Sequence, residues 1–450
     1  MLKVDNKNLK DNYFPKALEM LKECIKIPSY LQDSQPKKPF GIGVSKVLDF
    51  IISSCNQLGF KTKVGEDYKY GYADYGDGEK LLAILCHLDV VPPGNLEQWK
   101  FDPFDPKVEN GVLFGRGALD DKGPTIMNIF AVKYLMDNKF IPDYKIRLVF
   151  GLAEETTWEC MQSYVKHEQL ADIGYTPDGQ FPLVYAEKWI LDCDVLGSEQ
   201  LDYEIKGGDA YNVVNDVVTY QGPKKEIISK YLKENKINNK ISNELLIVEG
   251  ISAHGSLPER GINAGTWLFK AMFEAGIKDN WTKLIALQFH QNFELKQIFG
   301  DLSDESGKLT ANLGIFDFKK DSQRMTINFR IPVHKEVEKD IVQVLKTYLK
   351  TNGLDYKTVA IEPRVYMSKE SDLVKKIMSV YQEVTGDLKT PPAAIGGGTF
   401  AKSMPNVVAF GAEFDLENSS MHAYNESIKI QELEKMLEIY TKSLVKLAKI

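Results

Sequence analysis

Histidine and acidic side chains recur where apolar stretches of this chain end, and these side chains bind metals and transfer protons. The segment HLD places His87 and Asp89 two residues apart after the apolar run LLAILC. Residues two apart in a strand point to the same face, so His87 could bind a metal while Asp89 accepts the second ring N–H of His87 or of another nearby ligand. By itself, the segment is more typical of a hydrogen-bonded histidine followed by a helix-capping aspartate.

The segment GRGALDDKG at 115–123 places two carboxylates, Asp120 and Asp121, at the start of a predicted helix. One aspartate could bridge two cations with one oxygen on each, and the ordinary alternative is capping of the helix. We expect Asp120 to be the bridge. Asp121 is expected to cap the helix or to support a metal ligand.

The segment GLAEE at 151–155 ends a second apolar stretch with Glu154 and Glu155. Two adjacent acids at the end of a buried strand are costly unless they have partners. Because adjacent side chains diverge, one carboxylate could bind a metal while the other acts as a general base toward a metal-bound water. The alternative is an exposed acidic loop.

Two further candidates are Asp178, in the turn PDG, and His422, in the segment MHAYNE. Each taken alone would be assigned to an ordinary turn or loop. All the candidates nevertheless occur at the ends of predicted strands or of the helices that join them, where a doubly wound sheet gathers its loops. Two ions roughly 3.5–4 Å apart need about this many nitrogen and oxygen ligands, with one carboxylate shared.

The elements that must position these residues alternate between helix and strand. Periodic apolar residues predict helices at 14–31, 43–58, 125–139 and 431–450. The apolar runs at 81–92 and 145–155 are typical of strands buried on both faces, and the helix between them completes a βαβ unit. The strand-like segment 406–414 is expected to join the same sheet.

The hydropathy pattern changes from 189 to 366, where strands with polar alternation are mixed with helices. We therefore predict an α/β protein in which residues 1–188 and 367–450 form a catalytic domain with a mixed, mainly parallel sheet flanked by helices. Residues 189–366 are predicted to form an inserted α+β domain.

The bulk composition excludes several classes of protein. A chain of 450 residues, 43% hydrophobic and 26% charged, is globular and long enough for two or three domains. The net charge of −7 is modest, so neither nucleic acid nor a membrane surface is an expected partner. The N-terminal segment has no apolar signal core and no apolar run could span a bilayer, which predicts a cytoplasmic protein. Its five scattered cysteines disfavour both a disulfide framework and a thiolate zinc site, so any metal must be held by His, Asp and Glu.

The ordered motifs HLD, GRGALDDKG, EE, PDG and MHAYNE resemble the zinc-dependent aminoacylase and carboxypeptidase superfamily. Detail such as EETTWECMQSYVKHE and GGGTFAKSMPNVVAFGAEF is similar to its bacterial dipeptidase branch, which contains Xaa-His (carnosinase-like) dipeptidases of the dipeptidase V type. The resemblance implies a zinc-peptidase-like fold with two divalent ions. It assigns His87 and Asp178 to one ion, Glu155 and His422 to the other, and Asp120 to both.

The same resemblance implies that Asp89 is an orienting acid and that Glu154 is the general base. It also identifies the inserted domain with the family's lid, which closes over the substrate. Within the lid, His254 would stabilise the oxyanion, although a buried structural histidine is the alternative. Substrate-binding roles are implied for Asn212, which would contact the reacting carbonyl, for Arg330, which would clamp a carboxylate, and for the loop Gly396, Gly397, Gly398 and Thr399. A tight strand-to-helix turn is the alternative for this loop.

These implications predict a metal-dependent dipeptidase that cleaves unblocked dipeptides with a water bridging two ions and with Glu154 as base. Zinc is the expected metal and manganese the alternative. Rival hypotheses are an N-acyl amino acid deacylase or desuccinylase of the same superfamily, and a non-catalytic metal-binding scaffold. The long insertion favours the dipeptidase and predicts a monomer, since in that branch the enlarged lid replaces a dimer partner. The other histidines, His167, His290 and His334, match no family site and are interpreted as surface or packing residues.

Overall fold

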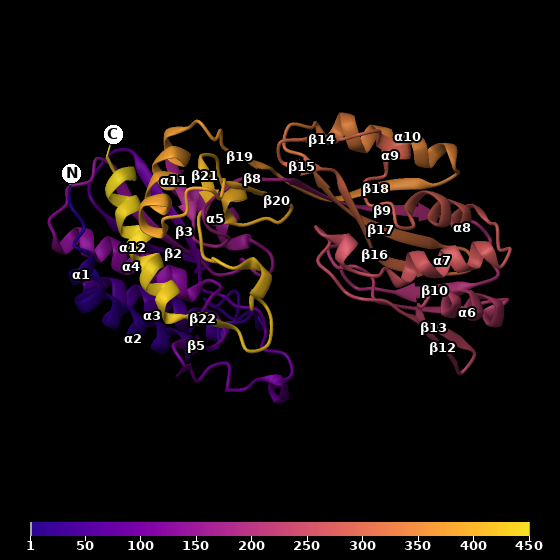
Figure 1. Cartoon of the computed structure of the whole chain (residues 1–450), viewed down its shortest axis with the longest axis horizontal. Helices are drawn as coiled ribbons and strands as arrows, with labels where there is room; N and C mark the ends of the chain where they lie inside the picture. The colour runs from indigo at the N-terminus through magenta and orange to yellow at the C-terminus, as the bar shows by residue number, and fades with distance from the viewer. Residues whose placement is uncertain (1, 450) are drawn as a thin grey trace. The chain divides into compact units, whose positions relative to one another are not determined.

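A computed structural model describes residues 2–449 and divides the chain into two compact units (Figure 1). Unit 1 contains the chain up to Ala186, the segment Val365–Ala393, and the chain from Thr399 onward. Unit 2 contains Glu187–Arg364 and the short segment Ala394–Gly398. The two main boundaries lie two residues before the predicted ones. The sequence predicted residues 394–398 as part of the catalytic domain, but they belong to unit 2. Among residues 2–449, no helix combines the length and the apolar character that a membrane span requires.

The main sheet of unit 1 is mixed. Its central pairings, β6 with β3, β3 with β7 and β7 with β21, are parallel, whereas β1 with β2, β2 with β6 and β21 with β8 are antiparallel. The predicted fold class is confirmed, and the four central strands β6, β3, β7 and β21 pair in parallel. In spatial order the strands are β1 Lys61–Val64, β2 Tyr70–Tyr75, β6 Lys145–Gly151, β3 Leu81–His87, β7 Ile173–Thr176, β21 Val407–Ala409, β8 Val184–Glu187 and β19 Val365–Tyr366, and β20 Ala393–Ile395 pairs with β8.

The predicted βαβ unit forms the centre of this sheet. Every residue of β3 is buried, as expected of a strand covered on both faces. Strand β3 runs parallel to β6 in the register that aligns Leu81 with Lys145 and His87 with Gly151. Helix α4, Lys122–Asp137, connects the two strands and is buried along most of its length, packing against both α2 and α12 (Figure 1).

Helices cover both faces of the sheet. The ring of Tyr70 in β2 meets Tyr164 of α5, whereas a side chain at the next residue, Gly71, would meet Leu48 of α3. Neighbouring residues of a strand point to opposite faces, so α5 and α3 lie on opposite sides. The remaining helical segments of unit 1 are α1 Asn6–Asn8, η1 Leu9–Tyr13, α2 Phe14–Ile25, α3 Ile42–Leu58, η2 Leu96–Gln98, α5 Glu159–His167, α11 Asp372–Thr385, η6 Phe400–Ser403, η7 Leu416–Asn418 and α12 Ile430–Leu447.

Several predicted elements were too long. The helix predicted over 14–31 ends at Ile25, because Pro28 disfavours helical geometry in the residue before it and cannot donate a backbone hydrogen bond. The strand predicted over 81–92 ends at His87, and the one predicted over 406–414 covers only Val407–Ala409. After His87 the first polar residue is Asp89, whereas β21 is followed by Phe410 and by Gly411, whose φ is 91°.

A second, three-stranded sheet of unit 1 joins distant parts of the sequence. Its strands, in spatial order, are β22 Ser427–Lys429, β5 Val112–Phe114 and β4 Lys107–Glu109. Strand β22 pairs antiparallel with β5 in the register that sets Ser427 opposite Phe114. The start of the loop after β5 and the end of the loop before β22 are therefore adjacent.

Unit 2 is an α+β unit with an eight-stranded sheet whose pairings are antiparallel. In β9 and β17, Cys193 and Ile327 belong to the apolar core, while Asp192 and Asn328 alternate onto the other face. The strands, in spatial order, are β12 Asn238–Ser242, β13 Leu245–Glu249, β11 Val217–Gln221, β10 Glu204–Gly207, β16 Thr310–Phe318, β17 Gln323–Ile331, β9 Trp189–Gly197 and β18 Asp355–Glu362. The other elements are α6 Lys225–Glu234, η3 Pro258–Arg260, α7 Ala264–Glu274, α8 Asn280–Leu284, η4 Ile285–Phe289, α9 Lys296–Phe299, β14 Ser303–Asp304, β15 Gly307–Lys308, η5 Val337–Val342 and α10 Gln343–Thr351.

Candidate active site

The carboxyl ends of β3 and β6 bring the first candidates together. His87 is the last residue of β3 and lies opposite Gly151, the last residue of β6, so the chain that continues to Glu154 and Glu155 starts beside the imidazole. Gly151 has to be small, since a Cβ there would lie 2.3 Å from the ring of Phe400. The same ring stands edge-on to His87, with centroids 6.1 Å apart, and helps to fix the imidazole.

Asp120 lies between two imidazoles. Its Oδ1 is 2.9 Å from Nε2 of His87, and its Oδ2 is 2.9 Å from Nε2 of His422. The carboxylate oxygens of Glu155 lie 3.0 and 3.1 Å from the same nitrogen of His422, and Oδ2 of Asp178 lies 3.8 Å from Nε2 of His87. The five predicted ligands thus form two groups that share Asp120.

Glu154 lies beside these groups. Its carboxylate, with His87 and Asp178, forms a set of three ligand atoms within 4.8 Å of one another. Asp120 and Glu155 form a second such set with His87. Adjacent glutamates therefore face different neighbours, as the divergence of adjacent side chains requires.

The crowded carboxylates raise one another's pKa. Burial, followed by the negative charge of Asp178, raises the pKa of Glu154 well above its usual range. Burial and the charge of Asp120 do the same for Asp178, and they raise the pKa of Glu155 to about 7. Carboxylates held this close together away from water need positive charge nearby.

The two imidazoles show where positive charge is favoured. Burial alone would lower the pKa of His87, but its hydrogen bonds with Asp120 and Asp89 outweigh burial and raise the pKa well above its usual range. The same balance raises the pKa of His422, whose hydrogen bonds are with Asp120 and Glu155. The field of the site therefore favours a cation at both ring nitrogens.

Asp121 supports the site without lying among the ligands. It precedes α4 but makes no side-chain capping bond to a helix amide. Its Oδ2 accepts instead from the backbone N–H of His87 at 3.1 Å and from the hydroxyl of Thr125 at 3.0 Å. Of the two predicted uses of Asp121, support of a ligand matches these contacts.

The contacts of Asp89 differ from the predicted pairing. Nδ1 of His87 lies 3.0 Å from the backbone carbonyl of Asp89 and 3.6 Å from its carboxylate. A carbonyl can only accept, so Nδ1 carries the proton and Nε2 is the nitrogen that could bind a metal. The two oxygens of the carboxylate accept instead from the backbone N–H groups of Glu154 and Glu155, each at 3.1 Å. Asp89 therefore orients the loop of the glutamates through its side chain and His87 through its main chain.

The sequence reasoning missed Arg116 and Glu426, which are almost completely buried against the loop of Asp120. Glu426 belongs to the segment MHAYNE that supplies His422, and Arg116 to GRGALDDKG. The available signal for these two residues was that each belongs to a motif that supplies a candidate ligand. Nothing in the local pattern showed that the two side chains meet.

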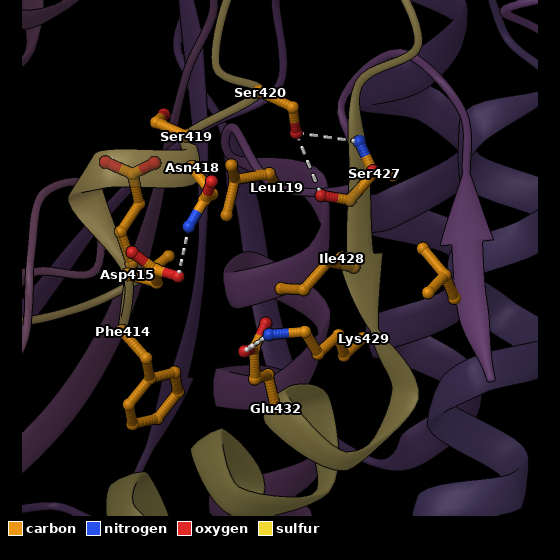
Figure 2. A pocket seen from close by; sticks show the side chains of 13 residues that line it. Leu119, Phe414, Asp415, Asn418, Ser419, Ser420, Ser427, Ile428, Lys429 and Glu432 are labelled. Atoms are coloured by element: carbon orange, nitrogen blue, oxygen red, sulfur yellow. Dashed lines mark hydrogen bonds and ion pairs between the residues drawn. The ribbon is translucent and has the colours of Figure 1, made fainter.

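A small cavity lies beside the loop that carries His422. It has a volume of about 190 Å³, and residues from Leu119 and the stretch 412–432 line most of it (Figure 2). Ser420 bridges the loop by accepting from the N–H of Ser427 and donating to its carbonyl, each at 3.0 Å. None of the predicted site residues lines this cavity.

The predicted lid residues His254 and Asn212 are neighbours within unit 2. The N–H of Gly255 donates to the carbonyl of Asn212 at 2.7 Å, and Nδ1 of His254 lies 2.7 Å from the hydroxyl of Ser256. His254 is exposed, so the alternative of a buried structural histidine is wrong. Its proposed role at the oxyanion stays a prediction.

Arg330 and the glycine loop also lie together in unit 2. The Nε of Arg330 donates to Asn328 at 2.9 Å, and its Nη1 donates to the carbonyl of Gly396 at 2.8 Å. A side chain at Gly396 would lie 2.9 Å from Ser256, which brings this loop to the segment of His254. Gly397 and Gly398 continue the loop in unit 2, whereas Thr399 belongs to unit 1 and accepts from the N–H of Ala401 at the start of η6.

The remaining histidines lie outside these groups. His290 packs edge-on against Trp267 with centroids 4.6 Å apart, and burial lowers its pKa to about 4. His167 and His334 are exposed. The interpretation as packing and surface residues matches these positions.

Comparison with known proteins decides the family. Residues 83–446 match the family described as Peptidase family M20/M25/M40. The chain belongs to this family. It is 31% identical to a Staphylococcus epidermidis protein named "Putative dipeptidase", over 96% of this chain and 97% of that protein. This membership makes the chain a metallopeptidase.

Solved structures of the peptidase fold extend over both units. The M20 family metallo-carboxypeptidase Sso-CP2 from Sulfolobus solfataricus has a TM-score of 0.60 at 20% identity, covering 96% of this chain and 99% of that one. Human carnosine dipeptidase 1 has a TM-score of 0.59 at 14% identity, covering 98% and 99%. At these identities the likeness establishes the fold.

The donor set of this M20/M25/M40 peptidase fits a pair of divalent ions. It consists of imidazole nitrogens and carboxylate oxygens, which zinc and manganese both accept. The two oxygens of Asp120 point to different imidazoles, as a bridging carboxylate requires. The excess of buried negative charge would be offset by the ions.

Proposed function

We propose that this peptidase hydrolyses unblocked dipeptides with two divalent ions. The observation that carries the proposal is Asp120, whose two oxygens each lie 2.9 Å from a different imidazole. Glu154 lies beside them, with its carboxylate within 4.8 Å of ligand atoms of His87 and Asp178. The name of the relative that is 31% identical over nearly the whole chain supports a dipeptide as the substrate.

Five side chains would hold the ions. His87 and Asp178 would bind one ion, Glu155 and His422 the other, and Asp120 both. When bound, the ions would polarise the peptide carbonyl and lower the pKa of a water molecule toward neutrality. Zinc is the proposed metal, with manganese the alternative that the same donors accept.

Glu154 would act as the general base. Burial and the charge of Asp178 raise its pKa, which makes the carboxylate a stronger base. It would accept a proton from the attacking water and deliver that proton to the leaving amine. Asp89 would keep the base in place, because its carboxylate accepts from the backbone N–H of Glu154.

We propose unit 2 as a lid that supplies substrate contacts. Two bonds hold the guanidinium of Arg330 through Nε and Nη1, and Nη2 takes part in neither, so it could meet a substrate carboxylate. Gly396 would admit the same carboxylate close to the backbone, Asn212 would contact the reacting carbonyl, and His254 would stabilise the oxyanion. We also propose a monomer, which sedimentation equilibrium would test.

A panel of peptides tests the activity. The purified chain is expected to hydrolyse unblocked dipeptides, to lose activity with a chelator and to regain it with zinc or manganese. Tripeptides and N-acyl amino acids are expected to react poorly. Hydrolysis of N-acyl amino acids in place of dipeptides would move the proposal to a deacylase, and no hydrolysis with metals bound would leave a metal-binding protein.

A further inference from the structure

We propose that Glu426 is a positioning residue that fixes the bridging aspartate Asp120, an inference that rests on the proposed two-metal function. Glu426 binds no metal in this scheme. It acts through the backbone of the loop that carries Asp120.

Glu426 gathers hydrogen bonds from one loop. Its Oε1 accepts from the N–H groups of Gly117 at 3.0 Å, Leu119 at 2.9 Å and Asp120 at 3.1 Å. Its Oε2 accepts from Nη1 of Arg116 at 2.8 Å and from the N–H of Gly117 at 3.1 Å. Every one of these partners is a donor, which matches an ionised carboxylate.

The fold brings Glu426 to this loop. Strands β5 and β22 pair in the register that sets Phe114 opposite Ser427, so the loop after Phe114 and the residue before Ser427 are adjacent. The N–H of Gly115 continues the ladder by donating to the carbonyl of Glu426 at 3.0 Å. Gly117 has a φ of 88°, which a residue with a side chain rarely adopts, and this turn directs its N–H to the carboxylate.

This contact joins the supports of two proposed ligands. Asp120 donates its own N–H to Glu426, and His422 lies four residues before Glu426 in the same segment. Each of the two residues directs a side chain to the other, with Nε2 of His422 2.9 Å from Oδ2 of Asp120. A shift of Glu426 would therefore displace the bridging oxygens and the loop of His422 together.

The charge of Glu426 is balanced on its outer side. The guanidinium of Arg116 is 2% exposed and lies over the ring of Trp99, 5.0 Å from its centroid. Arg116 thus holds Oε2, while Oε1 is left to the amides of the Asp120 loop. The alternative reading is an ordinary buried ion pair that contributes only to stability.

A second buried ion pair of unit 1 provides the control for that alternative. Arg147 in β6 holds Asp74 with two hydrogen bonds of 2.7 Å, and both side chains are largely buried. Arg147 lies four residues before the end of β6, and none of the bonds of this pair involves a ligand or a ligand loop. Loss of this pair should lower stability without changing metal affinity.

Equilibrium dialysis of the full chain against Zn²⁺, and titration with Co²⁺ followed by its visible spectrum, test the proposal. The wild type is expected to bind two ions. Glu426→Gln replaces one accepting oxygen by an NH₂ group that faces donors, so both ions should bind about 10–100-fold more weakly with an altered Co²⁺ spectrum. Asp74→Asn should keep the affinity and spectrum of the wild type.

The outcomes separate the two proposals. A wild type that binds fewer than two ions contradicts the two-metal function itself. Wild-type affinity and spectrum in Glu426→Gln, or an equal loss of affinity in Asp74→Asn, overturn the positioning role while leaving the function intact. Should Glu426→Gln not fold, hydrogen exchange of the wild type decides: Zn²⁺ should slow exchange in 115–121 and 423–429 together, and protection of only one segment overturns the proposal.

Discussion

At the scale of single residues, Asp120 and Asp121 show how neighbours in the chain acquire different properties. Burial raises the pKa of both carboxyls, but the bonds of Asp120 with His422 and His87 outweigh burial and hold its pKa below the usual range. Asp121 lacks such partners, and burial raises its pKa to about 7. The carboxylate of Asp120 is thus held in its charged form, whereas Asp121 accepts a hydrogen bond from the backbone of His87.

Glu154→Gln is expected to keep both metals and to lose most turnover. The amide has nearly the shape of the acid but cannot take a proton, so kcat should fall about 10²–10⁴-fold. Glu159→Gln is the matched control, because Glu159 lies on the surface and forms a salt bridge with Lys69. Steady-state hydrolysis and metal analysis check both variants. Near-normal turnover in Glu154→Gln would refute its role as base.

Metal affinity is expected to rise with pH. Without metals the pKa values of His87, His422, Glu154 and Asp178 are raised, so near pH 7 the site holds protons that an ion must displace. Raising the pH removes these competing protons, and each proton released adds about tenfold to the affinity per pH unit. Calorimetry in buffers of different ionisation enthalpy counts the protons. An affinity that is flat between pH 6 and pH 8 would contradict the expectation.

The sequence predicted which of these residues lie together better than it predicted their individual contacts. Histidines and carboxylates at the ends of strands or the starts of helices can be recognised in the sequence alone, which is why His87 and Asp120 could be singled out. The carboxylate of Asp89 was expected at an imidazole but accepts from two backbone amides. Such a contact depends on the loop conformation after β6, which no spacing in the sequence determines.

At the scale of elements, three buried acids bind the backbone of the segments that carry the proposed metal ligands. Asp121 accepts from the N–H of His87, Asp89 from that of Glu155, and Glu426 from that of Asp120. Each loop leaves the sheets at a strand end or a helix start, where backbone N–H groups lack regular partners. Each of these acids thus satisfies main-chain N–H groups and also orients a proposed ligand.

Element boundaries could be predicted only where a local signal ends them. Helix α3 begins and ends close to the predicted 43–58, because Gly41 precedes it and Gly59 ends it in a left-handed conformation. The pairing of β5 with β22, which brings Glu426 to Asp120, joins strands more than 300 residues apart and each only three residues long. Strands so short carry no periodic pattern that a sequence could reveal.

The packing of α7 against η4 is expected to make stability depend on pH. Burial, followed by the charge of Lys270, lowers the pKa of His290 from 6.5 to about 4. The unfolded chain therefore binds this proton before the folded chain does, so the contribution is complete above pH 6.5 and is lost as the pH falls toward 4. Its size is roughly 2 kcal/mol after allowance for partial exposure.

His290→Phe isolates this contribution, because the ring keeps its contact with Trp267 and no longer titrates. Urea unfolding at pH 7.5 and pH 5 should show a smaller loss of stability in the variant than in the wild type. His334→Phe, at an exposed position, is the control and should follow the wild type. Equal losses in all three proteins would show that His290 is not the titrating group.

At the scale of the whole molecule, unit 2 is built as an insertion whose ends are neighbours. Strands β9 and β18 pair antiparallel at the beginning and end of the insertion, with Ile190 opposite Glu362. The apolar core of unit 2 is drawn entirely from residues between 191 and 354. The change to polar-alternating strands mixed with helices indicated the insertion in the sequence. The positions of its ends depend on this strand pairing. The short segment at 394–398 also belongs to unit 2, and its three glycines indicated a loop but not that this loop returns to the inserted unit.

This arrangement predicts that unit 1 can bind metals without unit 2. Replacing residues 190–362 by a few Gly and Ser residues should be tolerated, because directly opposed residues in an antiparallel pair have Cα atoms only about 5 Å apart. All five proposed ligands belong to unit 1, so the shortened chain should still bind two ions. Dipeptide hydrolysis should fall at least about 100-fold, since the shortened chain lacks His254 and Arg330. Full-length His254→Ala is the companion variant and should also lose activity with both metals bound. Hydrolysis by the shortened chain at the wild-type rate would remove unit 2 from the reaction, whereas a folded shortened chain without metals would show that unit 1 alone does not complete the site.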